Sequence, residues 1–181
     1  MIVHRPPSPG HVFWIFGLSG AGKSTLASAL IGDLRGRGVP VLALDGDILR
    51  NGLCTGLGFS DGDRRENLRR AALVAQLGTA SGLCVVASFI TPLETNRQLV
   101  REILGPDHLS LIYADSPLEV CRQRDVKGLY ARAQAGQIPQ MTGMGSSFQV
   151  PAQVDLTLST ATETPAASVQ KLVEFALGKL R

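Results

Sequence analysis

The chain has 181 residues, of which 44% are hydrophobic and 18% are charged, and its formal net charge is +3. This composition is typical of one folded domain that is long enough to bury a core without disulfide bonds. The small charge favours a small anionic ligand over nucleic acid as a partner, and no apolar run approaches the roughly 20 residues of a membrane span. Three cysteines without a C-x-x-C pair and three scattered histidines predict neither a zinc site nor a disulfide framework, and we expect a cytoplasmic location.

The chain is expected to begin with an extended lead-in and then to alternate strands with helices. Residues 1–10 contain three prolines, and residues 11–181 are expected to form a single domain. Strands are predicted at 12–16, 39–44, 83–89, 109–114 and 155–159. Helices are predicted from about 23 to a glycine-rich stop at 36–38, then at 48–53, 64–80, 96–104, 117–124 and 165–180. This order predicts a three-layer α/β fold with a parallel sheet of about five strands.

The loop after the first strand contains a phosphate-binding motif. The residues fit G-x-x-x-x-G-K-[ST] and are Gly17, Leu18, Ser19, Gly20, Ala21, Gly22, Lys23 and Ser24, followed at once by Thr25. Glycines let successive N–H groups point into one concavity, and the helix that follows adds its positive N-terminus. We therefore expect ATP phosphates here, with Lys23 reaching the β- and γ-phosphates and the Ser24 hydroxyl bound to Mg²⁺.

A second set of polar residues follows the second strand. Asp45 and Asp47 come directly after it, and Arg50 lies one helical turn further on. Ligands gather at the carboxyl ends of parallel strands, so a carboxylate here is suited to accept the proton of an attacking hydroxyl or to hold Mg²⁺. The alternative is that Asp47 only caps the short helix that begins at residue 48.

Four arginines, Arg64, Arg65, Arg69 and Arg70, lie on the next predicted helix. Most such charge runs only solvate a helix face. However, Arg64 closely follows Phe59, and an aromatic ring beside a guanidinium group forms a reasonable nucleotide-binding pair. Composition leaves both interpretations open.

Residues 125–151 interrupt the alternation of strands and helices. The segment contains four glycines and two prolines, and its only helical pattern is a turn or two around residues 129–134. A loop this long in a compact domain is usually functional or disordered. We favour a lid, because the γ-phosphate expected at the P-loop would have to be shielded from water during its transfer.

Taken together, these motifs resemble those of the adenosine 5′-phosphosulfate (APS) kinase family, also called adenylylsulfate kinases. The similarity runs from about residue 11 to the C-terminus. It rests on the P-loop, on Leu44-Asp45-Gly46-Asp47, Leu57-Gly58-Phe59-Ser60, Asp63-Arg64, Glu66-Asn67, Arg69-Arg70, Ser88-Phe89-Ile90-Thr91-Pro92, Pro117-Leu118-Glu119-Val120-Cys121, and Arg124-Asp125 with Lys127-Gly128-Leu129-Tyr130. The resemblance implies a P-loop kinase fold, ATP and Mg²⁺, APS as the nucleotide substrate, and a homodimer.

The resemblance also implies a role for each matching residue. Asp47 would orient or deprotonate the ribose 3′-hydroxyl, Asp45 would support Mg²⁺, and Arg124 would lie on the ATP side. Lys127 would act as a lid cation over the phosphates. The remaining acceptor residues would be Arg50, Phe59, Arg64, Asn67, Ile90, Thr91 and Met141, with Phe59 stacked on the adenine.

The departures from the family pattern are concentrated in the lid and in the segment after the third strand. Where the family reads F-T-G-I-D-D-P-Y-E, this chain reads Met141-Thr142-Gly143-Met144-Gly145-Ser146-Ser147-Phe148-Gln149. Where the family reads I-S-P-Y-R-x-D-R, a serine is replaced by Thr91 and a basic residue by Glu94, and Val126 replaces a proline. Two alternatives therefore stand beside APS phosphorylation: a related kinase with another nucleotide-like acceptor, and a nucleotide-binding regulatory module without turnover.

Overall fold

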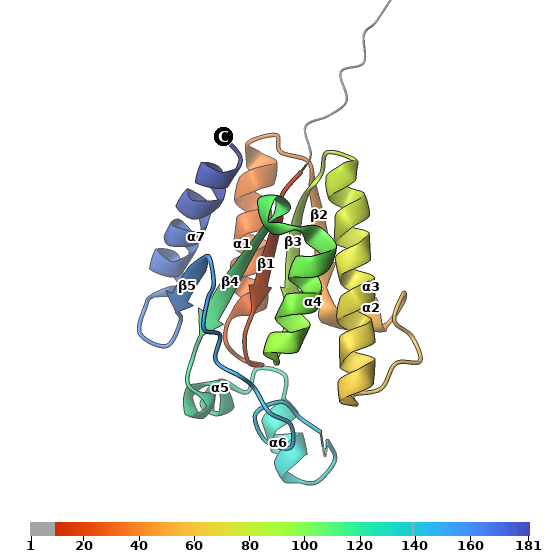
Figure 1. The fold of residues 1–181 in the computed structure, drawn as a ribbon. Helices are drawn as coiled ribbons and strands as arrows, with labels where there is room; N and C mark the ends of the chain where they lie inside the picture. The colour runs from red at the N-terminus through yellow and green to blue at the C-terminus, as the bar shows by residue number, and fades with distance from the viewer. Residues whose placement is uncertain (1–9, 139) are drawn as a thin grey trace, which may run out of the picture.

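The computed structural model describes residues 10–138 and 140–181, so the lead-in expected over residues 1–10 lies, apart from Gly10, outside the described part. Its centre is a five-stranded sheet in the order β2-β3-β1-β4-β5, and all the neighbouring strands are parallel (Figure 1). The strands are β1 (Val12–Phe16), β2 (Val41–Asp45), β3 (Cys84–Phe89), β4 (Leu109–Asp115) and β5 (Leu156–Ser159). The parallel α/β fold predicted from the sequence is confirmed.

The central strand β1 is buried on both faces, which explains its unbroken apolar sequence. Phe13 and Ile15 point into one core cluster, and Trp14 and Phe16 point into the other, because successive side chains of a strand alternate between faces. All five residues of β1 are 0% exposed. The sheet is therefore packed on both sides and holds the loops at its carboxyl edge.

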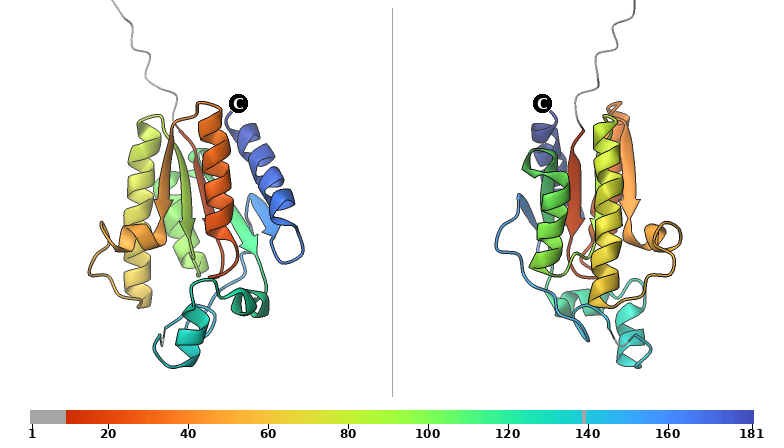
Figure 2. Two further views of the ribbon diagram at one scale, coloured as in Figure 1. Left: turned by 180° about the vertical axis from the view of Figure 1, so that it is seen from behind. Right: turned by 45° about the vertical axis from the view of Figure 1, so that its right-hand side comes forward.

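Two pairs of helices form the outer layers. Helices α1 (Lys23–Gly36) and α7 (Pro165–Lys179) cover one face, and α3 (Asp61–Ala80) and α4 (Glu94–Leu104) cover the other (Figure 2). Helix α3 begins three residues earlier than the apolar pattern predicted, because the Ser60 hydroxyl accepts a hydrogen bond from the Asp63 amide at 3.1 Å and caps the helix.

Three short helices lie near the carboxyl edge of the sheet: α2 (Gly46–Arg50), α5 (Leu118–Arg124) and α6 (Leu129–Gln134). A 3₁₀ turn, η1 (Pro106–His108), directly precedes β4. The segment 125–151 thus contains one helix and is partly packed: Phe148 stacks on Tyr113 with ring centroids 6.1 Å apart. In the described part of the chain, no helix combines the length and the apolar character needed to cross a membrane.

Candidate active site

A cavity of about 550 Å³ opens at the carboxyl edge of the sheet. It is bounded by the P-loop, by the loops after β2, β3 and β5, and by the beginning of the 125–151 segment. The expected site residues that line it are Ser19, Gly20, Gly22, Lys23, Ser24, Thr25, Asp45, Asp47, Arg50, Phe59, Arg64, Asn67, Ile90, Thr91, Arg124 and Lys127. Residues that are distant in sequence therefore meet around one space.

The P-loop owes its shape to glycines with a positive φ. Gly20 has φ 79°, and a Cβ atom there would lie 2.9 Å from the carbonyl oxygen of Cys121. At Gly17, with φ 148°, a Cβ atom would lie 2.5 Å from the Ala114 carbonyl oxygen. Gly17, Leu18 and Ala21 do not line the cavity, and the side chains of Leu18 and Ala21 are buried below it. These three residues set the path of the loop.

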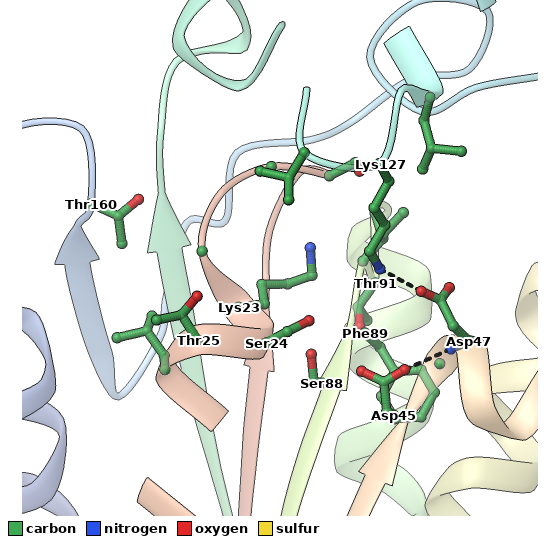
Figure 3. Close-up of a pocket in the computed structure, with 18 of the residues that line it drawn as sticks. Lys23, Ser24, Thr25, Asp45, Asp47, Ser88, Phe89, Thr91, Lys127 and Thr160 are labelled. Atoms are coloured by element: carbon green, nitrogen blue, oxygen red, sulfur yellow. Dashed lines mark hydrogen bonds and ion pairs between the residues drawn. The ribbon is translucent and has the colours of Figure 1, made fainter. Parts of the chain in front are cut away.

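Lys23 projects its amine toward the middle of the cavity (Figure 3). Its Nζ donates a hydrogen bond to the carbonyl oxygen of Leu18 at 2.7 Å. Burial and, as a smaller contribution, the nearby positive charge of Lys127 together lower the pKa of Lys23 to about 8. A desolvated ammonium group with a single backbone acceptor is well suited to an anionic ligand.

The two aspartates after β2 have different tasks. Asp45 is the N-cap of α2, since its Oδ1 accepts a hydrogen bond from the Asp47 amide at 2.9 Å. The alternative that Asp47 is the cap is therefore wrong. Asp47 lies in the first turn, and its exposed carboxylate pairs with the Lys127 ammonium group across the cavity (Figure 3).

Ser24, in the first turn of α1, and Asp45, at the end of β2, both line the cavity, as Figure 3 shows. Among residues 10–138 and 140–181, no group of three or more His, Cys, Asp or Glu side chains is placed to hold a metal ion. Mg²⁺ in kinases is usually held by one or two protein oxygens together with water and phosphate oxygens. A hydroxyl and a carboxylate facing a phosphate loop fit such an ion.

The opposite side of the cavity is formed around Phe59, whose side chain is 53% exposed. The guanidinium carbon of Arg50 lies 4.4 Å from the ring centroid and that of Arg64 lies 5.6 Å from it. Burial lowers the pKa of both arginines, and for Arg64 the charge of Arg50 adds to the effect. Two cations beside an aromatic ring favour a ligand that combines a base with an anionic group.

Asn67 is 5% exposed and lines the same side of the cavity. Within the described residues, its Oδ1 has no hydrogen-bond partner. Buried polar atoms are normally satisfied, so this oxygen is suited to accept a bond from a ligand donor. Further along the helix, Arg69 and Arg70 pair with Glu66 at 2.7 and 2.9 Å, so this part of the arginine run does solvate a helix face.

The loop after β3 forms the part of the cavity wall that lies between the P-loop side and the Phe59 side. Thr91 has φ 44°, a left-handed conformation that is unusual for a β-branched residue. Its hydroxyl accepts a hydrogen bond from Trp14 Nε1 at 2.9 Å, and the residue is 1% exposed. Strained backbone of this kind often occurs where a site is held in place by its surroundings.

On the P-loop side, Arg124 bridges two loops. Its Nη2 donates to the Thr160 carbonyl oxygen at 2.6 Å and its Nη1 to the Gly20 carbonyl oxygen at 3.4 Å. The part of the wall that follows β5 was not predicted from the sequence. Its residues are Thr160, Glu163, Pro165, Ser168 and Val169. Their position after a parallel strand was the available signal.

Met141 is the one expected acceptor residue that the structure does not bring to the cavity. It is 6% exposed and lies in the core cluster that also contains Leu18 and Tyr130. The expected contact between Met141 and a bound base is therefore absent from this arrangement.

The comparisons with known proteins agree with this geometry. The family model for adenylylsulphate kinase matches residues 9–159. The curated adenylyl-sulfate kinase of Pseudomonas aeruginosa is 44% identical over 164 residues, which is 91% of this chain and 84% of the relative. That of Erwinia tasmaniensis is 48% identical over 155 residues, covering 86% of this chain and 77% of the relative.

Solved structures give the same result. The APS kinase of Mycobacterium tuberculosis, in complex with AMPPNP and APS, superposes with a TM-score of 0.90 at 39% identity over 94% of this chain and 99% of that one. The hexameric APS kinase from Thiobacillus denitrificans gives a TM-score of 0.71 at 27% identity, and its match covers 98% of this chain and 31% of that chain. With the family model, the relatives and the cavity in agreement, this chain belongs to the adenylylsulphate kinase family.

Proposed function

We propose that the protein transfers the γ-phosphoryl group of ATP to the ribose 3′-hydroxyl of APS, which gives 3′-phosphoadenosine 5′-phosphosulfate and ADP. One observation carries the proposal: the half-buried amine of Lys23 and the carboxylate of Asp47 open onto one cavity, whose far wall is the ring of Phe59 between two arginines. This arrangement offers a site for phosphates and a separate site for a nucleotide that carries a hydroxyl.

On the donor side, the backbone of the P-loop would surround the phosphates of ATP, and Lys23 would neutralise the charge that develops on the transferred group. Arg124 and Thr160 form the wall beside the P-loop, where the rest of the nucleotide would lie. The Ser24 hydroxyl and the Asp45 carboxylate would hold Mg²⁺, which would supply positive charge to the phosphates of ATP when bound.

On the acceptor side, the adenine of APS would stack on Phe59, and Arg50 and Arg64 would attract its phosphosulfate group. Asn67 would accept a hydrogen bond from a ribose hydroxyl, and Ile90 and Thr91 would form the adjoining wall. Met141 contributes to the core below the segment rather than to this surface.

Asp47 would accept the hydrogen bond of the 3′-hydroxyl and then its proton, while the hydroxyl oxygen forms a bond to the γ-phosphorus. The bond between the γ-phosphorus and the bridging oxygen breaks, and ADP leaves with that oxygen. Lys127 now pairs with Asp47, and we propose that ATP phosphates draw it away and thereby free the carboxylate. The 125–151 segment would then act as a lid that excludes water.

The test is a coupled assay of ADP release with Mg-ATP, in which APS at low micromolar concentration is compared with AMP, CDP and no acceptor. A large rate with APS alone is the expected result. Binding of ATP without an APS-dependent rate would reject the proposal. A rate with another acceptor would then favour a related kinase, and no rate with any acceptor would favour a regulatory module.

The resemblance also implies a homodimer, and we propose that state for this chain. The Thiobacillus denitrificans relative is hexameric, so higher assemblies exist in the family. Light scattering coupled to gel filtration measures the mass directly. A mass of about twice 19.2 kDa supports the proposal, whereas a monomeric or hexameric mass rejects it.

A further inference from the structure

The side chain of Arg97 is 0% exposed, although it lies on the surface helix α4 and does not line the cavity. A buried guanidinium group is costly unless its charge is paired and its donors are bonded. Here Nε donates to Glu94 Oε2 at 2.7 Å, which supplies the countercharge. The other donors point inward, and all of their acceptors are backbone carbonyl oxygens.

These carbonyl oxygens belong to two segments that are far apart in sequence. Nη1 donates to the carbonyl oxygens of Thr91 at 3.1 Å and Pro92 at 3.3 Å, and both of these residues line the cavity. Nη2 donates to the carbonyl oxygen of Gln149 at 3.0 Å, near the end of the 125–151 segment. One planar group thus fixes the spacing between the loop after β3 and the end of the lid segment.

A third element lies against the same guanidinium group. The ring of Phe16, the last residue of β1, has its centroid 5.3 Å from the guanidinium carbon of Arg97. Phe16 is followed by Gly17, whose amide donates to the Ile90 carbonyl oxygen at 3.3 Å. The beginning of the P-loop and the wall of the acceptor side are therefore joined through these contacts.

The loop held in this way is also strained, because Thr91 has φ 44°. Residues in such conformations persist only where their surroundings hold them. Trp14 holds the Thr91 hydroxyl, and Arg97 holds the Thr91 carbonyl oxygen. Without Arg97, relaxation of the loop would move Ile90 and Thr91 relative to Phe59 and Asn67 on the opposite wall.

We propose that Arg97 is a positioning residue for the acceptor: it acts through Thr91, Pro92 and Gln149 and sets the width of the acceptor side of the cavity, without touching either substrate. The inference rests on the proposed function for the identity of the acceptor. We expect the donor side to depend on Arg97 much less, because Arg97 meets that side through the ring of Phe16, whereas the path of the P-loop is set by its own glycines.

The first experiment measures KM for APS and KM for ATP separately in Arg97→Lys. Lysine keeps the positive charge but cannot span the three carbonyl oxygens. We expect the KM for APS to rise about tenfold, the KM for ATP to stay within about twofold, and kcat to fall by less than about threefold. A loss of thermal stability with both KM values unchanged would show a purely structural role and overturn the proposal.

Arg101→Lys is the matched control. Arg101 also pairs with Glu94, at 2.8 Å, but its other bond goes to the Gln153 carbonyl oxygen outside the cavity. Both KM values should remain at the wild-type level. If Arg97→Lys does not fold, Glu94→Gln is the alternative test. It removes the negative charge that pairs with Arg97, and the half-exposed Glu94 side chain is easier to replace than the buried arginine. It should raise the KM for APS about threefold, and an unchanged value would reject the proposal.

A second readout does not depend on catalysis. The Gln149 amide donates to the Pro92 carbonyl oxygen at 2.9 Å, so its hydrogen exchange reports whether the two segments are joined. In Arg97→Lys this amide should exchange at least tenfold faster, with the P-loop amides unchanged. If wild-type protein shows no turnover of APS, the proposed function fails, and unchanged exchange at Gln149 would separately refute the positioning role.

Discussion

Around the P-loop the cavity wall is formed mainly by one run of consecutive residues, whereas around Phe59 it is formed by residues from several segments. The donor side takes its shape from consecutive residues, with Gly17 and Gly20 at positive φ under close carbonyl oxygens. The acceptor side is assembled from separate segments: Arg64 donates to the Phe59 carbonyl oxygen at 2.9 Å and also to the carbonyl oxygen of Gln140, which is 76 residues away in sequence. The first kind of site is specified locally, and the second depends on contacts distant in sequence.

This difference predicts separable effects. Substitutions on the donor side should affect the use of ATP with every acceptor, because the phosphates and the transferred group are bound there. Substitutions on the acceptor side should change the KM for one substrate and leave the other almost unchanged.

The largest effect is expected for Lys23→Ala. The amine projects from the P-loop into the cavity where the phosphates would lie, and removing one preorganised charge of this kind typically costs on the order of 10²–10³ in turnover. Steady-state ADP release measures it. Lys179→Ala, an exposed lysine at the end of α7, is the control and should keep wild-type turnover. Near-normal turnover in Lys23→Ala would contradict the role of the P-loop.

Asp47→Asn should lower kcat by about 10²-fold, because the amide cannot take the hydroxyl proton. The KM for ATP should change little, since Asp47 lies across the cavity from the P-loop. Single-turnover kinetics isolate the chemical step. Asp33→Asn is the control: it removes a carboxylate that pairs with Arg37 on α1, and it should have no effect. An unaltered chemical step in Asp47→Asn would show that another group accepts the proton.

The donor side could be predicted from the sequence almost completely, because its shape is encoded in eight consecutive residues and their strand–helix setting. Lys23, Ser24 and Thr25 all line the cavity as the motif indicates. The residues after β5 were missed, since Thr160 and Glu163 belong to no short motif and reach the cavity only through the order of the strands.

The acceptor side could be predicted only in part. Arg50, Phe59 and Arg64 line the cavity as expected, but the position of Met141 was not foreseen. Whether a methionine faces a ligand or the core depends on how its segment packs, and local sequence does not specify that packing. The cap at Asp45 rather than Asp47 was missed for a related reason: helix ends are set within one or two residues by details of backbone geometry.

The pKa of Lys23 predicts a pH dependence on the donor side. In the free protein this pKa is lowered to about 8, and bound phosphates raise it again, so binding takes up a proton above pH 8. Affinity for a non-hydrolysable ATP analogue should therefore fall about tenfold between pH 7 and pH 9, as measured by calorimetry. In the same range the free energy of unfolding of the free protein should rise, because Lys23 loses its proton in the folded state but keeps it in the unfolded chain. Lys23→Arg stays protonated and should show no such fall in affinity.

Phe59→Ala should have a smaller effect than the substitutions of Lys23 and Asp47, and it tests the acceptor side alone. Stacking of a base on an aromatic ring contributes about 1–3 kcal/mol, so the KM for APS should rise roughly tenfold while the KM for ATP stays constant. The ring is 53% exposed, so thermal stability should hardly change. Leu77→Ala is the control: it truncates an exposed apolar side chain that lies on α3, away from the cavity, and it should leave both KM values unchanged. A parallel rise in both KM values would mean that Phe59 supports the whole cavity, and the two sides would then not be separable.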